Sequence, residues 1–193
     1  MELTYVADQT FTGLDYSEEK LSEMEFEYCT FQNCNFSRAN IFNTDFLETE
    51  FINCNFSNAN LNGSIFQEIT FNNCKMLGLE LAECNQFNFV VLFEHCQLNH
   101  CSFYQMNLSR TRFFSCQLKG TDFVEANLKN TTINNCDLFD TRFENTNLEN
   151  ADFRNSINYS IDPESNHIEG ATFSFPEVVG LLDKFNIKIN PKD

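Results

Sequence analysis

The stretch that decides the fold runs from Phe31 to Leu61 and reads FQNCNFSRANIFNTDFLETEFINCNFSNANL. Every fifth residue in it, beginning with Phe31, is Phe, Ile or Leu, and the residue two positions earlier is always small. A period of five matches neither the 3.6-residue period of an α-helix nor the two-residue period of a flat strand. The pattern therefore predicts a backbone that turns a corner every five residues.

The same spacing extends in both directions along the chain. Steps of five from Phe11 to Leu81 meet only apolar residues, and so do steps of five from Phe93 to Phe153. The two blocks, 11–81 and 93–156, are offset by two residues, so we expect the register to break within 82–92. We interpret the break as a tolerated insertion that bulges or kinks the rod. The alternative is a joint that aims the two halves, or a partner-contact site.

Similar residues also recur at a spacing of twenty, which predicts a square coil of four five-residue sides. Successive coils would pair at strand spacing, about 4.8 Å, and place like side chains above like. Stacked aromatic and aliphatic side chains would then form the core and supply most of the stability. The predicted core residues are Phe31, Phe51, Phe71, Phe103, Phe123 and Phe143, with Cys34, Cys54, Cys74, Cys96, Cys116 and Cys136 at the small position.

The positions of the cysteines indicate small core residues rather than metal ligands or catalytic groups. Eight of the nine fall on the small inward position, and only Cys84, in the register break, does not. A metal site is the alternative, because two His-Cys pairs occur at positions 95–96 and 100–101. However, inward cysteines and outward histidines cannot converge on one ion, as zinc requires. We expect no metal, no cofactor and no catalytic residues, because no nucleophile–base set or phosphate loop is implied either.

Charge restricts the partners. The chain has 193 residues and a formal net charge of −16, from 12 basic and 28 acidic residues. Such a surface disfavours nucleic acid and anionic membranes and favours a basic protein. There is no apolar run of about 18 residues and no signal-like N-terminus. With an odd number of cysteines, these features lead us to expect a reduced, cytoplasmic protein without a membrane segment.

Both ends of the rod should need caps, since an open coil exposes unpaired backbone and core. We assign residues 1–10 to an N-terminal cap and 157–193 to a C-terminal cap with a helix at about 176–186. Val178, Leu181, Leu182 and Phe185 form one apolar stripe along that helix. The stripe could cover its own end of the rod, join two chains as a homodimer through their C-terminal ends, or do both.

Several units resemble a known repeat, A(D/N)LXX, whose central Leu or Phe points inward. The clearest examples are Ala39-Asn40-Ile41, Ala59-Asn60-Leu61, Ala126-Asn127-Leu128 and Ala151-Asp152-Phe153. On these residues the chain, over roughly 11–156, resembles the pentapeptide-repeat family. The resemblance implies an all-β fold, a right-handed quadrilateral β-helix, here with a short C-terminal helix for capping or dimerisation.

Shorter features are similar to one subgroup, the Qnr-type quinolone-resistance and microcin-immunity proteins. They are the segment 77–84 before the break, then Asp162-Pro163-Glu164, and Leu181-Leu182 in the terminal helix. The resemblance implies a dimeric DNA-mimic rod that binds DNA gyrase or topoisomerase IV and modulates it or protects it from quinolones or toxins.

The candidate contact face lies in residues 39–74, which contain no Lys or Arg. It consists of Asp45, Glu48, Glu50 and Glu68. Many Qnr-type proteins carry long projecting loops, whereas this chain gains only two residues, so topoisomerase binding is expected more strongly than drug protection. The alternative function is an interaction scaffold for another basic protein.

Overall fold

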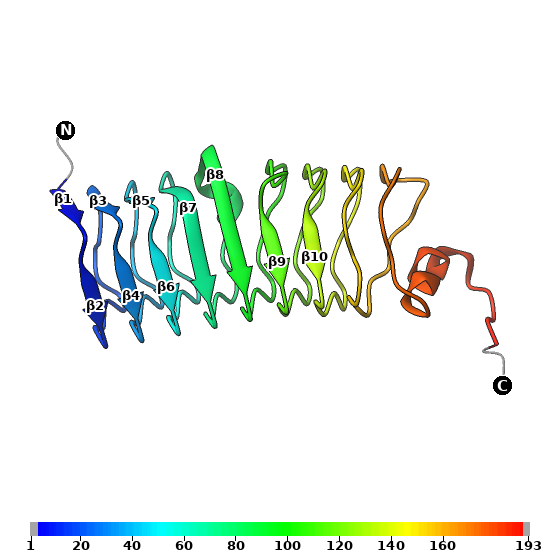
Figure 1. Ribbon diagram of the computed structural model, residues 1–193, viewed down its shortest axis with the longest axis horizontal. Coiled ribbons are helices and arrows are strands. Elements are labelled where there is room, and N and C mark those ends of the chain that lie inside the picture. Colours follow the sequence, from blue (N-terminus) through cyan, green and yellow to red (C-terminus); the bar gives the residue numbers. More distant parts are fainter. Residues whose placement is uncertain (1–3, 191–193) are drawn as a thin grey trace.

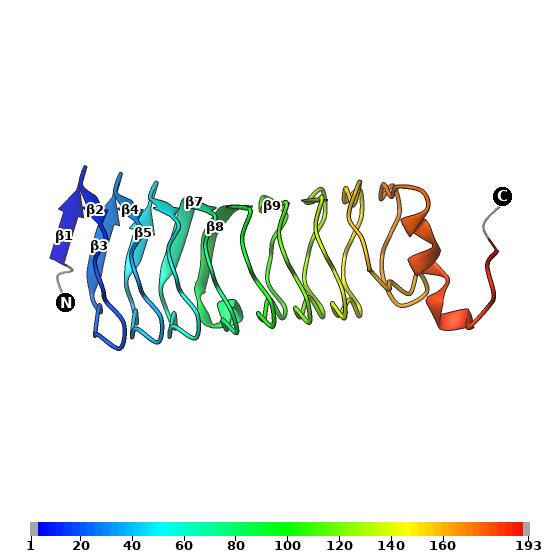
Figure 2. The ribbon, with the colours of Figure 1, turned by 90° about the horizontal axis from the view of Figure 1, so that it is seen from below.

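The computed structural model describes residues 4–190 and shows a parallel β-solenoid whose coils stack along one axis (Figures 1 and 2). Strand pairing advances by twenty residues per coil, as in Phe31↔Phe51 and Phe51↔Phe71, which confirms the predicted coil. The strands are β1 (Thr4–Ala7), β2 (Thr10–Thr12), β3 (Met24–Glu27), β4 (Thr30–Gln32), β5 (Asp45–Leu47), β6 (Glu50–Ile52), β7 (Ile65–Asn72), β8 (Asn85–Glu94), β9 (Arg112–Phe114) and β10 (Thr132–Asn134). None of the helices in this part of the chain is long and apolar enough to cross a membrane.

The strands occupy two neighbouring sides of the square coil. The first side holds β1, β3 and β5, and the second holds β2, β4, β6, β9 and β10, while β7 and β8 run along both. The other two sides pair through single bridges, such as Asn35↔Asn55 and Asn40↔Asn60. The corners contain left-handed residues such as Asn33, Asn53 and Asn73, with φ near 54°. Asn tolerates this conformation better than most residues, so the polar fifth residue of each unit makes the turn.

The core is a set of stacked rings. Phe51 lies between Phe31 and Phe71, with ring centroids 5.2 and 4.9 Å apart, and meets Phe46 and Phe56 edge to face. Most Cys, Ser and Thr side chains at the small inward position bond a carbonyl 23 residues earlier, as the Cys54 Sγ does to Phe31 at 3.3 Å. The predicted core residues, from Phe31 to Phe143 and from Cys34 to Cys136, are all buried.

The assignment of Cys84 outside the core was wrong. Its side chain is buried, and its neighbour Asn85 pairs with Ile65 in the ordinary twenty-residue register. The Asn85 amide donates to the Ser64 carbonyl at 2.9 Å, so Cys84 stacks on Ser64 at the small position. The 3-10 helix η1 (Leu81–Glu83) precedes it without disturbing the register.

The extra two residues are confined to a bulge at 86–89 in β8. Ile65 pairs with Asn85, but Gln67 pairs with Val90 and Ile69 with Val91. The break is thus shorter than the expected 82–92 and affects one side of the coil, where β8 extends beyond its neighbours (Figure 1). Within the bulge Phe89 is buried, whereas Phe87 is 66% exposed.

The bulge leaves one hydrogen bond of the repeat unmade. The Thr121 and Thr131 hydroxyls donate to the carbonyls of Leu98 and Leu108, 23 residues earlier, at 2.8 and 2.9 Å. The corresponding carbonyl for Thr111 falls within the bulge. Among the described residues the buried Thr111 hydroxyl has no hydrogen-bond partner.

This difference predicts opposite outcomes for one substitution at two equivalent sites. Thr131→Val removes a buried hydrogen bond to the Leu108 carbonyl, which keeps its bond from the Thr111 amide, so it should lower the free energy of unfolding by about 0.5–1.5 kcal/mol. Thr111→Val removes an unpaired hydroxyl, so it should be neutral or stabilising. Urea unfolding of both variants measures the difference. Equal losses would show that Thr111 is hydrogen-bonded like the others.

The N-terminal residues belong to the solenoid. Thr4–Ala7 forms β1 and pairs with β3, so Val6 stacks on Phe26. Residues 4–10, expected to form a separate cap, are therefore part of the first coil. Residues 1–3 of the assigned cap, and 191–193 at the other end, lie outside the described part of the chain.

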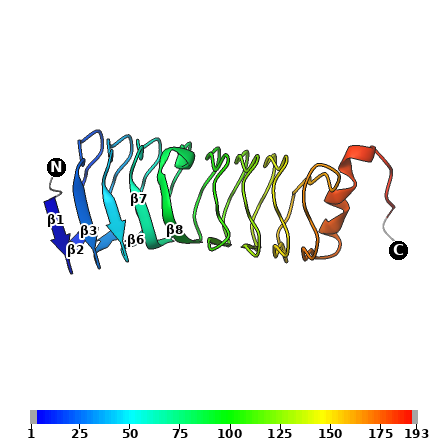
Figure 3. The same cartoon turned by 90° about the horizontal axis from the view of Figure 1, so that it is seen from above.

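The C-terminal helix is shorter than expected. In place of one helix over 176–186 there are two 3-10 helices, η2 (Glu177–Leu181) and η3 (Asp183–Phe185), set against the end of the rod (Figures 2 and 3). Gly180 within η2 disfavours a continuous α-helix. It also lets the backbone pack closely on Tyr159, and the Ile161 amide donates to the Gly180 carbonyl at 3.1 Å. Docking on the rod thus sets the path of this segment.

Candidate functional site

The four acidic candidates surround the corner where the first and second sides meet. Asp45 begins β5 on the first side, Glu48 turns the corner with φ of 45°, and Glu50 begins β6 on the second side. Glu68 turns the same corner one coil further, within β7, with φ of 57°. Glu48 and Glu68 are exposed, and Asp45 and Glu50 are half-buried. We call these four residues the acidic edge.

Further acidic groups adjoin this edge that sequence reasoning did not select. Glu25 pairs with Asp45 in the register of β3 and β5, so two carboxylates lie side by side. Tyr5 donates a hydrogen bond to Glu27, which raises the pKa of Tyr5 to about 12. The twenty-residue spacing of Glu25 and Asp45 was visible in the sequence and could have identified the pair.

Burial raises the pKa of Asp45, and the neighbouring Glu25 carboxylate raises it further. The folded protein therefore binds a proton at Asp45 more tightly than the unfolded chain does. Ionised Asp45 must then destabilise the fold at neutral pH, and this cost disappears when the group is protonated.

Replacing Asp45 with asparagine should consequently raise the melting temperature at neutral pH. The gain should shrink as the pH falls through the raised pKa of Asp45 towards the ordinary value of about 4, because protonation then removes the same charge. Asp15→Asn is a control of opposite sign, because a hydrogen bond with Ser17 lowers the pKa of Asp15. A neutral-pH melting temperature for Asp45→Asn at or below that of the parent would refute this electrostatic interpretation.

Charge is distributed unevenly along the rod. Residues 1–90 contain 14 acidic and 3 basic residues, whereas residues 91–193 contain 14 acidic and 9 basic residues. Five basic residues of the second half form salt bridges with carboxylates, whereas Arg38 with Glu18 is the salt bridge found in the described first half. Unpaired negative charge is therefore concentrated in the first half of the rod, which carries the acidic edge.

The cysteines and histidines do not form a second kind of site. The Cys96 thiol donates inward to the Phe71 carbonyl at 3.3 Å, whereas the His95 ring packs outside against Phe114. Burial raises the pKa of Cys101 to about 12 and that of Cys84 further, which disfavours the reactive thiolate. Within residues 4–190 no group of three or more His, Cys, Asp or Glu could hold a metal ion.

The apolar stripe at the C-terminal end divides into two parts. Leu181 packs against the core and Val178 is half-buried, whereas Leu182 and Phe185 are 38% and 52% exposed. Leu182 lines a groove of about 450 Å³ with Val179, Asp183, Asn186, Ile187 and Ile189. The stripe therefore covers the rod only in part and leaves an apolar surface at its end.

A parallel solenoid with five-residue sides, a filled core and its charge outside defines a class of repeat proteins. The family model described as "Pentapeptide repeat region" matches residues 44–122. A second family model, "Pentapeptide repeats (8 copies)", matches residues 20–58 and 136–157. The chain belongs to the pentapeptide-repeat family. A search of curated proteins finds no match.

Solved structures share the fold at low identity. A trypsin-treated variant of QnrB1, a plasmid-mediated fluoroquinolone resistance protein, matches with a TM-score of 0.65 and 16% identity over 97% of this chain and 100% of that chain. A second trypsin-treated QnrB1 variant gives 0.52 and 16% over 98% and 100%. HetL from Nostoc sp. strain PCC 7120, involved in heterocyst differentiation regulation, gives 0.52 and 18% over 87% and 84%.

Proposed function

We propose that this protein is a non-enzymatic DNA mimic that binds a type II topoisomerase, DNA gyrase or topoisomerase IV, through its acidic edge. Binding modulates the enzyme or protects it from quinolones or toxins in the cytoplasm. The observation that carries the proposal is the row of carboxylates at one corner of the rod, without salt bridges in the described structure.

The spacing of these carboxylates suits a surface that binds duplex DNA. Equivalent positions in adjacent coils are about 4.8 Å apart, and one strand of duplex DNA carries one phosphate per about 3.4 Å of helix axis. A basic groove would therefore meet negative charge at a comparable density, and the field would also accelerate encounter.

The electrostatic cost at this surface supports the same interpretation. Asp45 is half-buried beside Glu25, and its raised pKa shows that the ionised form is disfavoured in the free protein. Residues that reduce stability are often kept for function. A cationic partner would relieve the repulsion, so binding should be accompanied by proton release from Asp45 wherever that group is partly protonated.

The structural similarity to QnrB1 agrees with a role against fluoroquinolones, but at 16% identity it establishes the shared fold alone. The same fold carries a regulatory role in HetL, so a scaffold for another basic protein is the second candidate. The acidic edge favours a basic partner under either proposal. The partner's identity is what separates them.

We further propose that two chains form a homodimer through their C-terminal ends. The exposed side chains of Leu182, Phe185 and Ile187 leave an apolar surface there, and the groove beside them can receive a second copy. A two-fold axis at this end would bury the same residues on both chains. The acidic edges would then face solvent along the whole dimer.

A gyrase supercoiling assay, with and without a quinolone, tests the proposed function. The parent protein should inhibit supercoiling or restore it in the presence of the drug. A variant carrying Asp45→Asn, Glu48→Gln, Glu50→Gln and Glu68→Gln should lose this effect. The matched control neutralises four carboxylates of the second half, with Glu125→Gln, Asp140→Asn, Glu144→Gln and Glu169→Gln. If the parent protein alters neither reaction and forms no complex with gyrase, the topoisomerase proposal is wrong. The second candidate, a scaffold for another basic protein, is then favoured.

A further inference from the structure

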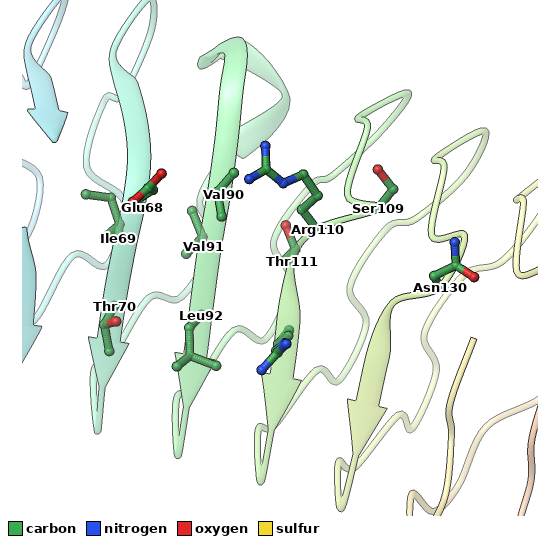
Figure 4. Close-up of a pocket in the computed structure, with 11 residues that line it drawn as sticks. Glu68, Ile69, Thr70, Val90, Val91, Leu92, Ser109, Arg110, Thr111 and Asn130 are labelled. Carbon is green, nitrogen blue, oxygen red and sulfur yellow. The ribbon is translucent and has the colours of Figure 1, made fainter. Parts of the chain in front are cut away.

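An open groove of about 610 Å³ lies beside the bulge, over β7, β8 and the start of β9. Glu68 and Thr70 lie on one flank, Val90 and Leu92 lie in the middle, and Arg110 lies on the other flank (Figure 4). Its volume falls within the range of about 300–1,000 Å³ typical of ligand sites. The groove begins at Glu68, which belongs to the acidic edge, and extends over the following coils as far as Asn130.

Two arginines in this groove lack the partners that other basic residues of the second half have. Arg110 and Arg112 are exposed and form no salt bridge within residues 4–190. By contrast, the Arg142 guanidinium bonds Asp122, one coil earlier, at 3.1 Å. The basic residues of this half that do pair with carboxylates are Lys119, Lys129, Arg142, Arg154 and Lys184.

The neighbouring coils explain why these two arginines are free. Arg112 pairs in register with Leu92 on one side and Thr132 on the other, so neither adjacent coil offers a carboxylate. Val90 and Asn130 line the groove with Arg110. Two arginines, two residues apart in the chain, thus border a strip with apolar Val90 and Leu92 in a protein whose net charge is −16.

A second observation marks the same place. The Thr111 hydroxyl, between the two arginines, is buried and has no partner among the described residues, because the bulge removes its carbonyl. A hollow of about 170 Å³ on the bulge side shares Val90, Ser109 and Arg110 with the groove. The exposed ring of Phe87 projects from the same bulge. The surface is therefore recessed and partly apolar where the positive charge is free, and the core beneath it is incompletely hydrogen-bonded.

We propose that this groove docks an acidic segment of a protein partner. Carboxylates of the segment bind Arg110 and Arg112, and an adjoining apolar side chain packs on Val90 and Leu92. Guanidinium groups match the two oxygens of a carboxylate. A nucleic acid is disfavoured, because Glu68 and the surrounding negative charge repel a chain of phosphates. The groove shares Glu68 with the acidic edge at one flank, but its arginines select the opposite charge.

Nuclear magnetic resonance of the Arg Nε–H groups tests this proposal without the natural partner. The probe is acetyl-Glu-Leu-Glu-amide at low salt, and the matched control is acetyl-Gln-Leu-Gln-amide. The Arg110 and Arg112 signals should shift together and saturate, while Arg142 and Arg154, already paired, stay in place. The apparent Kd for the neutral peptide should be at least about tenfold higher, as expected for the loss of a charge-assisted hydrogen bond.

The double variant Arg110→Ala/Arg112→Ala should lose at least about tenfold in peptide affinity. Lys20→Ala/Lys75→Ala is the matched control, because it removes the same charge from residues outside the groove that are exposed and form no salt bridge within residues 4–190. The proposal fails if the two peptides bind equally, if the control variant loses as much affinity as the groove variant, or if all arginine signals move alike. Tighter binding of inorganic phosphate or of a short DNA duplex at Arg110 and Arg112 would also overturn it, in favour of a phosphate site.

Discussion

Replacing Phe51 by alanine should lower the free energy of unfolding by about 3–5 kcal/mol, the loss typical of a large aromatic side chain removed from a core. The Phe51 ring is fully buried and lies between the rings of Phe31 and Phe71. It also meets Phe46 and Phe56 edge to face, so alanine would leave a cavity bordered by three coils. Rigid neighbouring rings cannot collapse into this space. Urea unfolding, followed by circular dichroism, measures the loss.

Phe11→Ala is the matched control at the end of the rod. Its ring stacks on Phe31 at 4.7 Å but is only half-buried, because it belongs to the first coil. In a solenoid each coil contacts only its neighbours, so the loss at Phe11 should be about half that at Phe51. A loss at Phe51 no larger than that at Phe11 would contradict the stacked core.

Gly180→Ala should release the C-terminal segment from the rod. A Cβ atom at this position would lie 2.0 Å from the Tyr159 carbonyl oxygen and 3.0 Å from the Tyr159 ring. The backbone must move apart, at a cost of about 1–3 kcal/mol for an overpacked site. The Ile161 amide, which donates to the Gly180 carbonyl, should then exchange its hydrogen about 10- to 100-fold faster. If dimerisation uses this end, the dimer fraction in sedimentation should fall as well.

Gly13→Ala provides the control at the opposite end. A Cβ there has no neighbour within 4 Å, although the left-handed φ of 67° adds a local conformational cost. It should leave Ile161 exchange and the dimer fraction unchanged. Unaltered Ile161 exchange in Gly180→Ala would mean that η2 is not packed on the rod as described.

The fold could be predicted because each side of the coil repeats the same five-residue pattern. A large apolar residue every five positions fixes the inward direction, and Asn, Glu or His two residues later accepts the left-handed corner. The stacking of Phe31, Phe51 and Phe71 then follows from the spacing of twenty. Outside the bulge, the pairing of strands between coils agrees with this local pattern.

The bulge was harder to place, because a period counted from both ends shows only that two residues are gained in between. Apolar Phe87 and Phe89 both continue a plausible inward pattern, yet one is exposed and the other buried. The pairing of Ile65 with Asn85, which keeps Cys84 inside, is decided by hydrogen bonds between coils. The sequence of a single coil does not show where these bonds between coils form.

The acidic edge was partly visible in the sequence and the arginine groove was not. Glu48 and Glu68 are twenty residues apart, so their alignment follows from the repeat. Nothing in the sequence distinguishes Arg110 and Arg112 from other charged residues, because the groove beside them depends on how β7, β8 and β9 lie together. Arg112 lies beside Leu92 and Thr132, each twenty residues away, so neither adjacent coil offers it a carboxylate at that position.

The most direct test of the central claim is the equilibrium affinity of the rod for DNA gyrase over a range of salt concentrations. The account predicts that the parent protein binds and that affinity falls steeply with salt. Neutralising the acidic edge should weaken binding at least about tenfold at low salt and flatten the salt dependence. Neutralising Glu125, Asp140, Glu144 and Glu169 instead should have little effect. Equal losses in the two variants would show that net charge alone matters, and absence of binding by the parent protein would contradict the claim outright.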